Sequence, residues 1–312
     1  MKICIFGGSG SFGTAMTKKL LEITNFEIII FSRNEKMQFE HKQKFNSDRI
    51  KYIIGDIRDY KAVYNVLEDV DYVMLASAMK HIDKCESNPN ECKKTNIDGC
   101  INVINASVER NVKKLIFLST DKAQNPSTLY GCSKLFVEMY CNHVNNKNTN
   151  IIKTRYGNVL FSNGSVGHIF AKLAKENKPL TVTTNENVES HRRFFMTINQ
   201  AVDLVLYALN NGKHGDLFVY NNKQCNIEKL AKAFSNNIVY IKERCIEKTD
   251  ESLLSINELN HSELLQKKYF RVNKNIKNDF EYNKPFTSET AEELTVEELQ
   301  DMIKESKEMG MI

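Results

Sequence analysis

Short apolar runs alternate with amphipathic stretches through the first half of the chain. Runs rich in Ile, Val, Phe and Leu predict strands, and apolar residues at helical spacing predict the helices between them. Strands are expected at residues 2–6, 27–31, 52–54, 71–76, 114–118 and 151–155, and helices at 14–21, 62–67, 96–110 and 130–144. Continuous apolar strands that alternate with helices are typical of a parallel sheet covered on both faces. The predicted class is α/β, with a doubly wound parallel sheet.

After residue 156 the pattern becomes more polar and less regular. Strands are expected at 180–184, 193–198, 216–220 and 238–241, and helices at 200–209, 227–234 and 295–305. Thr295 and Glu298 have the spacing of a capping box at the start of the last helix. Because the strand at 216–220 suits the first sheet, we expect two interleaved domains. The predicted first domain is 1–161 with 196–222, and a smaller, discontinuous α/β substrate-binding domain is 162–195 with 223–312.

Composition excludes several classes of protein. The 312 residues are 41% hydrophobic and 26% charged, with a net charge of +4 spread along the chain, so we expect a folded protein with no nucleic-acid partner. No apolar run approaches the ~18 residues of a membrane span, and Gly7-Gly8 interrupts the apolar start, so we expect neither secretion nor membrane insertion. Eight cysteines without a CxxC pair indicate reduced thiols in the cytoplasm. His81, Cys85 and Cys92 match no zinc-site spacing, and we expect no metal.

Three glycines follow the first strand and open the first helix. Gly7, Gly10 and Gly13 permit a tight turn, a close backbone approach to a pyrophosphate and close helix–strand packing. The phosphates would lie on the helix N-terminus, at Ser11 and Phe12. Between a strand and a helix, this pattern predicts a dinucleotide site of the Rossmann type.

The end of the second strand indicates which dinucleotide binds. An acidic residue there would favour NAD, but the chain has Ser32 and Arg33, and the planar guanidinium suits the 2′-phosphate of NADP. The other interpretation is that Arg33 is a solvated surface residue. Asp56 and Ile57 follow the third strand and are placed to flank the adenine. Two further residues, Ala76 and Lys80, lie at the end of the fourth strand or just after it, on the cofactor edge.

Candidate chemistry lies at residues 119–134. Tyr130 and Lys134 are four apart and share one helical face, and Thr120 supplies a hydroxyl at the end of the preceding strand. For Tyr130 to act as a base near neutrality, its pKa must fall by roughly three units, about 4 kcal/mol. We expect Lys134 and a positively charged oxidised cofactor to lower it. Asp121 and Lys122 follow Thr120 and are either a charged turn or an acid–base pair for proton transfer on an oxidised substrate.

These residues carry a family resemblance. The chain resembles the extended short-chain dehydrogenase/reductases, and within them the configuration-inverting UDP-N-acetylglucosamine 4,6-dehydratases of surface-glycan pathways. The matching stretches are Gly8–Gly13, Phe31–Glu35, Ile54–Asp59, Ala78–His81, Lys94–Ile97, Leu118–Ala123 and Arg155–Val159. Thr120-Asp121-Lys122 is the most informative, because retaining dehydratases have Asp-Glu there. The segments Tyr269–Val272 and Leu294–Glu298 are similar to a branch that also inverts carbon 5.

The resemblance implies a mechanism with a tightly bound, recycled NADP. Tyr130 takes the proton of the sugar 4-hydroxyl during oxidation at carbon 4. Lys122 then removes the proton from carbon 5, Asp121 protonates the departing 6-hydroxyl, and carbon 5 is reprotonated from the opposite face. The product is a UDP-2-acetamido-2,6-dideoxy-4-keto-L-hexose.

The resemblance also implies residues for the sugar nucleotide. The candidates are Lys80, His81, Asn158, Arg193, Arg244 and Glu247. His191-Arg192-Arg193 either binds the diphosphate or forms a solvated turn, and His81 is either a general acid or a surface histidine. In the family's Arg-x-Gly-Glu-Lys loop this chain has Ile246 in place of glycine, and a β-branched residue resists positive φ.

Two other functions stay open. A UDP-sugar 4-epimerase needs Thr120, Tyr130 and Lys134 but not Asp121 and Lys122, and an NADP(H)-sensing protein would use the same fold without turnover. Apolar residues on more than one face of the helices at 96–110 and 130–144 predict a helix-bundle dimer, so we expect a homo-oligomer.

Overall fold

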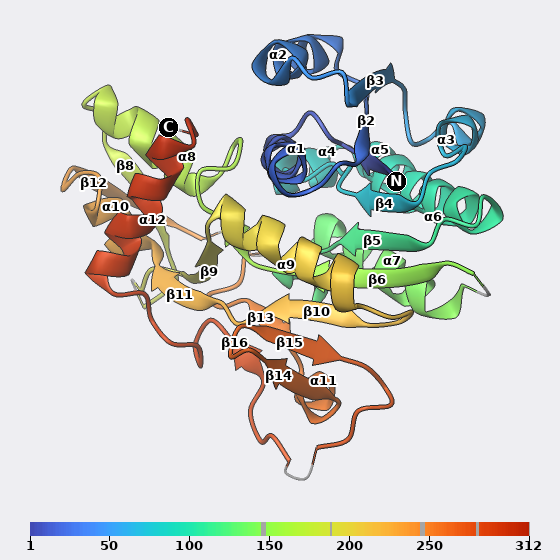
Figure 1. The fold of residues 1–312 in the computed structure, drawn as a ribbon. Helices are drawn as coiled ribbons and strands as arrows, with labels where there is room; N and C mark the ends of the chain where they lie inside the picture. The colour runs from blue at the N-terminus through green and yellow to red at the C-terminus, as the bar shows by residue number, and fades with distance from the viewer. Residues whose placement is uncertain (145–147, 188, 244–246, 279–280, 312) are drawn as a thin grey trace. The chain divides into compact units, whose positions relative to one another are not determined.

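The chain forms two compact units, each assembled from two segments (Figure 1). The computed structural model describes residues 1–144, 148–187, 189–243, 247–278 and 281–311. The first unit comprises Met1–Arg155 and Val202–Phe218, and the second comprises Tyr156–Ala201 and Val219–Ile312. Which unit binds the cofactor and which binds the sugar nucleotide stays a prediction.

A parallel sheet forms the centre of the first unit. Its strands are β1 (Lys2–Phe6), β2 (Glu27–Ser32), β3 (Ile50–Ile54), β4 (Tyr72–Leu75), β5 (Lys114–Leu118), β6 (Asn150–Arg155) and β10 (Leu217–Tyr220), the last of which crosses the unit boundary. Their order is β10-β6-β5-β4-β1-β2-β3, and the pairs from β6 to β3 are all parallel. The strand order reverses beside β1, so the doubly wound sheet predicted from the apolar runs is confirmed.

Helices connect these strands. They are α1 (Ser11–Ile23), α2 (Glu35–Phe45), α3 (Tyr60–Val66), α4 (Ile82–Ser87), α5 (Pro89–Cys92), α6 (Gly99–Glu109), α7 (Leu129–His143) and α9 (Ile198–Asn211). A π-helical turn (Lys93–Asp98) leads into α6, and a 3₁₀ turn (Asp121–Ala123) follows β5. The sequence pattern missed α2, because the segment is mostly polar, although Asn34 caps it by accepting from the Met37 amide at 3.0 Å.

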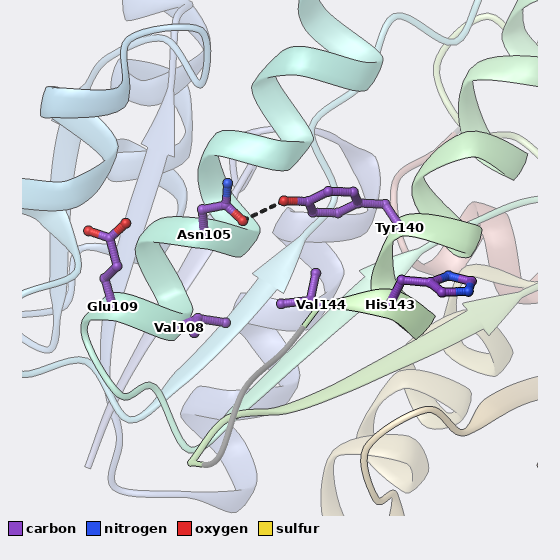
Figure 2. A pocket seen from close by; sticks show the side chains of 6 residues that line it. All are labelled: Asn105, Val108, Glu109, Tyr140, His143 and Val144. Atoms are coloured by element: carbon purple, nitrogen blue, oxygen red, sulfur yellow. Dashed lines mark hydrogen bonds between the residues drawn. The ribbon is translucent and has the colours of Figure 1, made fainter.

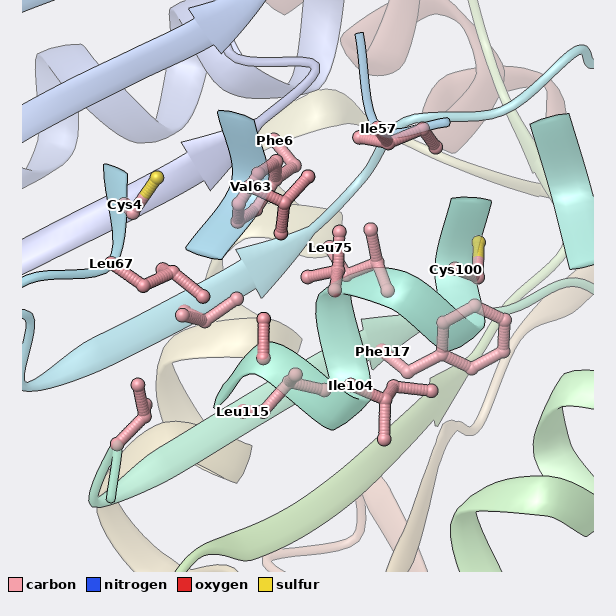
Figure 3. Packing of buried hydrophobic residues seen from close by; sticks show 14 of the residues in the cluster. Cys4, Phe6, Ile57, Val63, Leu67, Leu75, Cys100, Ile104, Leu115 and Phe117 are labelled. Atoms are coloured by element: carbon pink, nitrogen blue, oxygen red, sulfur yellow. The ribbon is translucent and has the colours of Figure 1, made fainter. Parts of the chain in front are cut away.

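Alternation along the strands builds the core on one face of this sheet. Cys4, Phe6, Leu75 and Phe117 belong to one buried cluster, into which α3, α6 and α7 insert residues such as Val63, Cys100 and Val137 (Figure 3). The residues between them, such as Ile3, Ile5 and Met74, are also completely buried. Both faces are therefore covered, which explains why the strands are continuous apolar runs.

The second unit contains smaller sheets, and its strands β14 and β15 belong to the same nine-stranded sheet as the strands described above. Its strands are β7 (Asn158–Val159), β8 (Leu180–Thr184), β9 (Arg192–Met196), β11 (Lys223–Asn226), β12 (Ile238–Lys242), β13 (Ser252–Leu254), β14 (Ser262–Leu265), β15 (Tyr269–Val272) and β16 (Phe286–Thr287). Its helices are α8 (Val166–Lys175), α10 (Ile227–Lys232), α11 (Ile256–Asn260) and α12 (Val296–Glu308). The order β11-β9-β7 forms one sheet, and β8 and β12 form a parallel pair.

The polar region after Asn221 is more ordered than its pattern indicates. Ser255 and Glu258 form a capping box at α11, and β14 and β15 form an antiparallel hairpin. The predicted capping box of Thr295 and Glu298 is confirmed at α12. None of the helices in the described ranges combines the length and hydropathy of a membrane span.

Candidate active site

The glycine turn after β1 is shaped by close backbone contacts. Gly7 has φ +81°, and its amide donates to the carbonyl of Phe31 at 2.8 Å. A Cβ on Gly7 would lie 2.9 Å from the Ser77 amide nitrogen, just after Ala76, and one on Gly13 only 2.2 Å from the Gly8 carbonyl oxygen. Side chains at these positions would force strand, turn and helix apart. The turn therefore needs glycine where the sequence pattern predicted it.

The N-terminus of α1 has the features of an anion site. Gly10 is the N-cap of this 13-residue helix, and it has no side chain that could accept from the first amides. The positive end of the helix dipole therefore lies at the first turn, which is formed by Ser11, Phe12 and Gly13. With glycine on both sides, a pyrophosphate could approach the backbone closely. These residues fit a dinucleotide.

A charged network lies at the ends of β2 and β3. The Arg33 side chain is 53% exposed, with Nη1 3.6 Å from Asp56 Oδ2, whereas Arg58 binds the same carboxylate oxygen at 2.6 Å. Burial opposes ionisation of Asp56, but the hydrogen bonds from Arg58 outweigh it and lower its pKa. The Ser32 hydroxyl lies 2.8 Å from Ser9 Oγ. Arg33 is thus held loosely and is available to a phosphate.

The structure restricts what one of the predicted cofactor residues, Ile57, can contribute. The Ile57 side chain is buried in the core cluster, where a Cβ on Gly99 would lie 2.6 Å from its Cγ1. That side chain is therefore not free to flank an adenine, and only its backbone could do so. Lys80 and His81 are exposed residues just beyond β4. The nearby Met79 is fixed by the buried Asn96, whose side chain accepts from its amide at 2.7 Å and donates to its carbonyl at 2.9 Å.

Asp121 forms the centre of a compact polar cluster at the end of β5. Its side chain is 1% exposed, and Oδ1 accepts from Thr120 Oγ1 at 2.8 Å and from Lys122 Nζ at 3.1 Å. Oδ2 is buried and has no hydrogen-bond partner among the described residues. A buried carboxylate oxygen without a partner is costly, so it calls for a ligand, an ordered water or a catalytic role.

Helix α7 brings Tyr130 to this cluster. Thr128 caps the helix by accepting from the Gly131 amide at 3.2 Å. A Cβ on Gly131 would lie 2.3 Å from the Lys122 carbonyl oxygen, so the first turn packs directly on the 3₁₀ turn. In this half-buried position, burial and the Asp121 carboxylate raise the pKa of Tyr130, and a hydrogen bond with Thr120 acts in the opposite direction.

Lys134 is buried one turn further along α7. Its Nζ donates to the Leu118 carbonyl at 2.7 Å and lies 4.6 Å from the centroid of the Phe117 ring. Burial lowers the pKa of this amine. Without the cofactor, burial and Asp121 raise the pKa of Tyr130, and the expected joint effect of Lys134 and an oxidised cofactor stays a prediction.

The next turn of α7 carries a buried residue that the sequence analysis missed. Glu138 forms an ion pair with Arg155 of β6, and both side chains are almost fully buried. Burial alone would raise the pKa of Glu138, but Arg155 reverses the effect and lowers it. The signal was present in the sequence, since Glu138 lies four residues after Lys134 and shares its helical face.

The predicted sugar-nucleotide residues lie in the second unit, apart from Lys80 and His81. Asn158 Nδ2 donates to the Phe194 carbonyl at 3.2 Å. Arg193 uses both terminal nitrogens on protein acceptors: Nη1 donates to the Arg192 and Thr249 carbonyls at 2.8 Å, and Nη2 to the Lys248 carbonyl at 2.7 Å. The stretch from His191 to Arg193 is therefore not a solvated turn, and its role in binding a diphosphate stays a prediction.

The remaining predictions concern residues 244–247 and a metal. Arg244 and Ile246 lie outside the described residues, whereas Glu247 is described and partly exposed. Within the described ranges, no three His, Cys, Asp or Glu residues are grouped as metal ligands would be.

Comparisons with known proteins agree with this geometry. A family model described as polysaccharide biosynthesis protein matches residues 3–274. A UDP-N-acetylglucosamine 4,6-dehydratase (inverting) of Campylobacter jejuni serotype O:23/36 is 41% identical over 285 residues, covering 88% of this chain and 83% of the relative. A UDP-glucose 4-epimerase of Rickettsia felis is 40% identical over 271 residues, covering 82% and 78%.

A solved structure shows the same fold. The X-ray structure of Pen from Bacillus thuringiensis is 30% identical, covers 98% of this chain and 97% of its own, and has a TM-score of 0.89. The glycine turn, the Thr120–Lys122 cluster and the Tyr130–Lys134 pair lie on the matched fold. The chain belongs to the polysaccharide biosynthesis protein family of extended short-chain dehydrogenase/reductases.

Proposed function

We propose that the chain is an NADP-dependent UDP-N-acetylglucosamine 4,6-dehydratase that inverts carbon 5. The observation that carries the proposal is the buried Asp121 carboxylate, with Lys122 Nζ 3.1 Å from Oδ1 and no described partner on Oδ2. An epimerase only needs to oxidise and reduce carbon 4, so it has no use for this acid–base pair. The inverting dehydratase of Campylobacter jejuni, at 41% identity, supports the same function.

Tyr130 would act first, as the base for the sugar 4-hydroxyl. The glycine turn after β1 would hold the dinucleotide, and the chemistry that it would supply is hydride transfer, from carbon 4 and back to carbon 6. Thr120 supports the phenolate through its hydrogen bond, but the raised pKa of Tyr130 opposes ionisation in the protein alone. Positive charge beside the phenol is therefore required, which ties proton removal to the oxidised form of the cofactor.

Lys122 and Asp121 would then carry out the elimination. Transfer of a proton from Lys122 Nζ, which lies 3.1 Å from Oδ1, to the Asp121 carboxylate produces a neutral amine and a carboxylic acid. The amine removes the proton of carbon 5, which the new ketone acidifies, and the acid protonates the 6-hydroxyl, which leaves as water. This elimination restores the ion pair of Lys122 and Asp121. Carbon 5 then gains a proton, which balances the proton that the 4-hydroxyl lost.

For the cofactor we propose NADP, with NAD as the alternative. Arg33 is more than half exposed, and its ion pair with Asp56 is long, at 3.6 Å. Arg58 already compensates the Asp56 carboxylate at 2.6 Å, so Arg33 can turn to a 2′-phosphate without leaving that charge unpaired.

The second candidate is a UDP-sugar 4-epimerase, which the Rickettsia felis relative favours. Turnover of UDP-N-acetylglucosamine in D₂O, followed by NMR of the product, separates the two. A 6-deoxy-4-keto sugar with deuterium at carbon 5 supports dehydration, and the L-configuration at that carbon in the same spectra supports inversion. A 4-epimer without loss of oxygen would refute it, and silence with several UDP-sugars would indicate a cofactor-sensing protein.

We also propose that two copies associate through α6 and α7. Leu129, Cys132, Phe136, Met139 and His143 follow one another at spacings of three and four residues along the exposed side of α7, and Phe136 and Met139 are 49% and 55% exposed. Such a stripe is typical of a helix–helix seam. A hollow beside it is lined by residues of both helices, including Asn105, Val108 and Tyr140 (Figure 2).

A further inference from the structure

Three consecutive residues, His191 just before β9 and the first two residues of that strand, hold a segment that comes about 55 residues later in the chain. His191 contacts Glu243, Arg192 contacts Asp250, and Arg193 contacts the backbone of Lys248 and Thr249. All of these residues belong to the second unit. The two flanks of residues 244–246 are thus attached to one short stretch of strand.

The His191 ring joins the two flanks. It is 3% exposed, with Nε2 2.6 Å from Glu243 Oε2 and Nδ1 3.0 Å from Arg193 Nη2. Because a guanidinium can only donate, Nδ1 accepts, and the ring proton lies on Nε2 and is donated to Glu243. One neutral imidazole therefore links Arg193, which holds Lys248 and Thr249, to Glu243.

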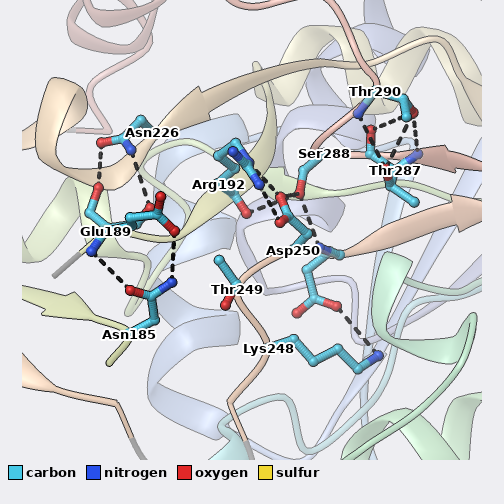
Figure 4. Close-up of polar contacts among 12 residues, drawn as sticks. Asn185, Glu189, Arg192, Asn226, Lys248, Thr249, Asp250, Thr287, Ser288 and Thr290 are labelled. Atoms are coloured by element: carbon cyan, nitrogen blue, oxygen red, sulfur yellow. Dashed lines mark hydrogen bonds and ion pairs between the residues drawn. The ribbon is translucent and has the colours of Figure 1, made fainter. Parts of the chain in front are cut away.

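Arg192 adds a second, more exposed anchor. It binds Asp250 through two parallel hydrogen bonds of 2.7 Å, and Ser288 Oγ donates to the same carboxylate at 2.8 Å (Figure 4). The Arg192 amide also donates to the Thr249 carbonyl at 3.1 Å. This anchor does not depend on His191, so loss of the ring would loosen the Glu243 and Lys248 positions without detaching Asp250.

We propose that His191 is a positioning residue for the sugar nucleotide: it fixes Glu243 and Lys248, which are close in sequence to Glu247, a residue that we predict to bind the substrate. The inference rests on the proposed function for the identity of the ligand. The Thr120–Lys134 residues that would perform the chemistry belong to the other unit. Loss of the ring should therefore weaken binding and leave the catalytic steps intact.

The test compares His191→Phe, which removes both hydrogen bonds, with His191→Gln, whose amide can accept from Arg193 and donate to Glu243. His261→Phe serves as the control, since that partly exposed ring bonds only the Asn257 carbonyl among the described contacts. UDP binding is measured by calorimetry, turnover of UDP-N-acetylglucosamine by steady-state kinetics, and amide hydrogen exchange at residues 243 and 247–250 by mass spectrometry, all on the full chain.

We expect His191→Phe to raise the Kd for UDP and the KM at least tenfold, with kcat within threefold and faster exchange confined to the 243–250 region. His191→Gln should restore most of the affinity. An unchanged Kd and exchange pattern in His191→Phe, or an equal loss in His191→Gln, would overturn the inference.

Two further comparisons distinguish a failure of this inference from a variant that does not fold and from a failure of the proposed function. If His191→Phe does not fold, Glu243→Ala removes the same contact from the partly exposed side and should show the same exchange change. If the wild-type protein binds UDP but yields no keto sugar, the proposed dehydration fails while the binding and exchange results still decide the role of His191. If the wild type does not bind UDP, that ligand is wrong, and unchanged exchange in both variants would still refute the positioning role.

Discussion

At the scale of single residues, the protein keeps a buried charge that folding alone does not require. Asp121 has one carboxylate oxygen shared by Thr120 and Lys122 and a second that is buried without a described partner. An apolar residue of similar size would avoid this cost. The cost is understandable if Oδ2 meets a hydroxyl of the substrate.

The first prediction concerns Lys122. Lys122→Ala should lower the rate of dehydration by about 10³-fold, because the base for carbon 5 is lost, a loss within the range of general base catalysis. Tyr130 is intact in this variant, so bound NADP⁺ should still be reduced on addition of UDP-N-acetylglucosamine, as absorbance at 340 nm reports. Lys84→Ala, at an exposed lysine of α4, is the control. Dehydration at the wild-type rate would refute the assignment.

The second prediction concerns cofactor choice. Arg33→Ala should weaken binding of NADP by about 10- to 100-fold and leave NAD binding nearly unchanged, since a charge-assisted contact contributes roughly 1.5–3 kcal/mol. Titration of the protein with each dinucleotide, followed by fluorescence of the reduced forms, measures both values. An equal effect on the two cofactors would contradict selection by Arg33 and favour the interpretation that it is a solvated surface residue.

At the scale of elements, one face of α7 carries the candidate catalytic residues and also the buried residue that holds the helix against the sheet. Tyr130, Lys134 and Glu138 follow at intervals of four residues, so the same face that meets the Asp121 cluster also meets β5 and β6. Gly131 lets the first turn of α7 lie against the Lys122 carbonyl. The position of Tyr130 therefore depends on packing along the helix as well as on its own contacts.

The third prediction tests this support. Glu138→Gln should lower the free energy of unfolding at pH 7 by about 3–5 kcal/mol, because the buried Arg155 guanidinium would lose the negative charge of Glu138. The pKa of Glu138 is lowered in the folded state, so its contribution is present above the ordinary glutamate value of about 4.3 and is lost as pH falls through the folded value. Urea unfolding between pH 3 and 7 should show that acidification lowers the free energy of unfolding less in the variant than in the wild type.

The control for this prediction is the exposed pair Lys36–Glu40, separated by 3.9 Å. Glu40→Gln should change stability by no more than about 0.5 kcal/mol. A similarly small effect of Glu138→Gln would show that the buried pair is not needed to hold α7 against β6.

At the scale of the whole molecule, the exposed apolar stripe of α7 leads to the fourth prediction. Glutamate at both Phe136 and Met139 should convert a wild-type dimer or larger assembly into monomers, because each charge would have to be buried in the seam. Sedimentation velocity measures the mass, and Ile169→Glu, at an exposed residue of α8, is the control. A wild-type protein that sediments as a monomer would refute this interface.

The sequence by itself determined the sheet, the glycine turn and the pair of Tyr130 and Lys134, because these depend on local spacing. Apolar runs define strands buried on both faces, and residues four apart must share a helical face. It did not determine α2 or the β14–β15 hairpin, whose polar segments are ordered by a cap and by strand pairing. Only the tertiary structure decided that Tyr130 has a raised pKa, that the Ile57 side chain is buried, and that Arg193 holds backbone carbonyls. Burial and hydrogen bonds between residues far apart in the chain set all three, and no local spacing encodes them.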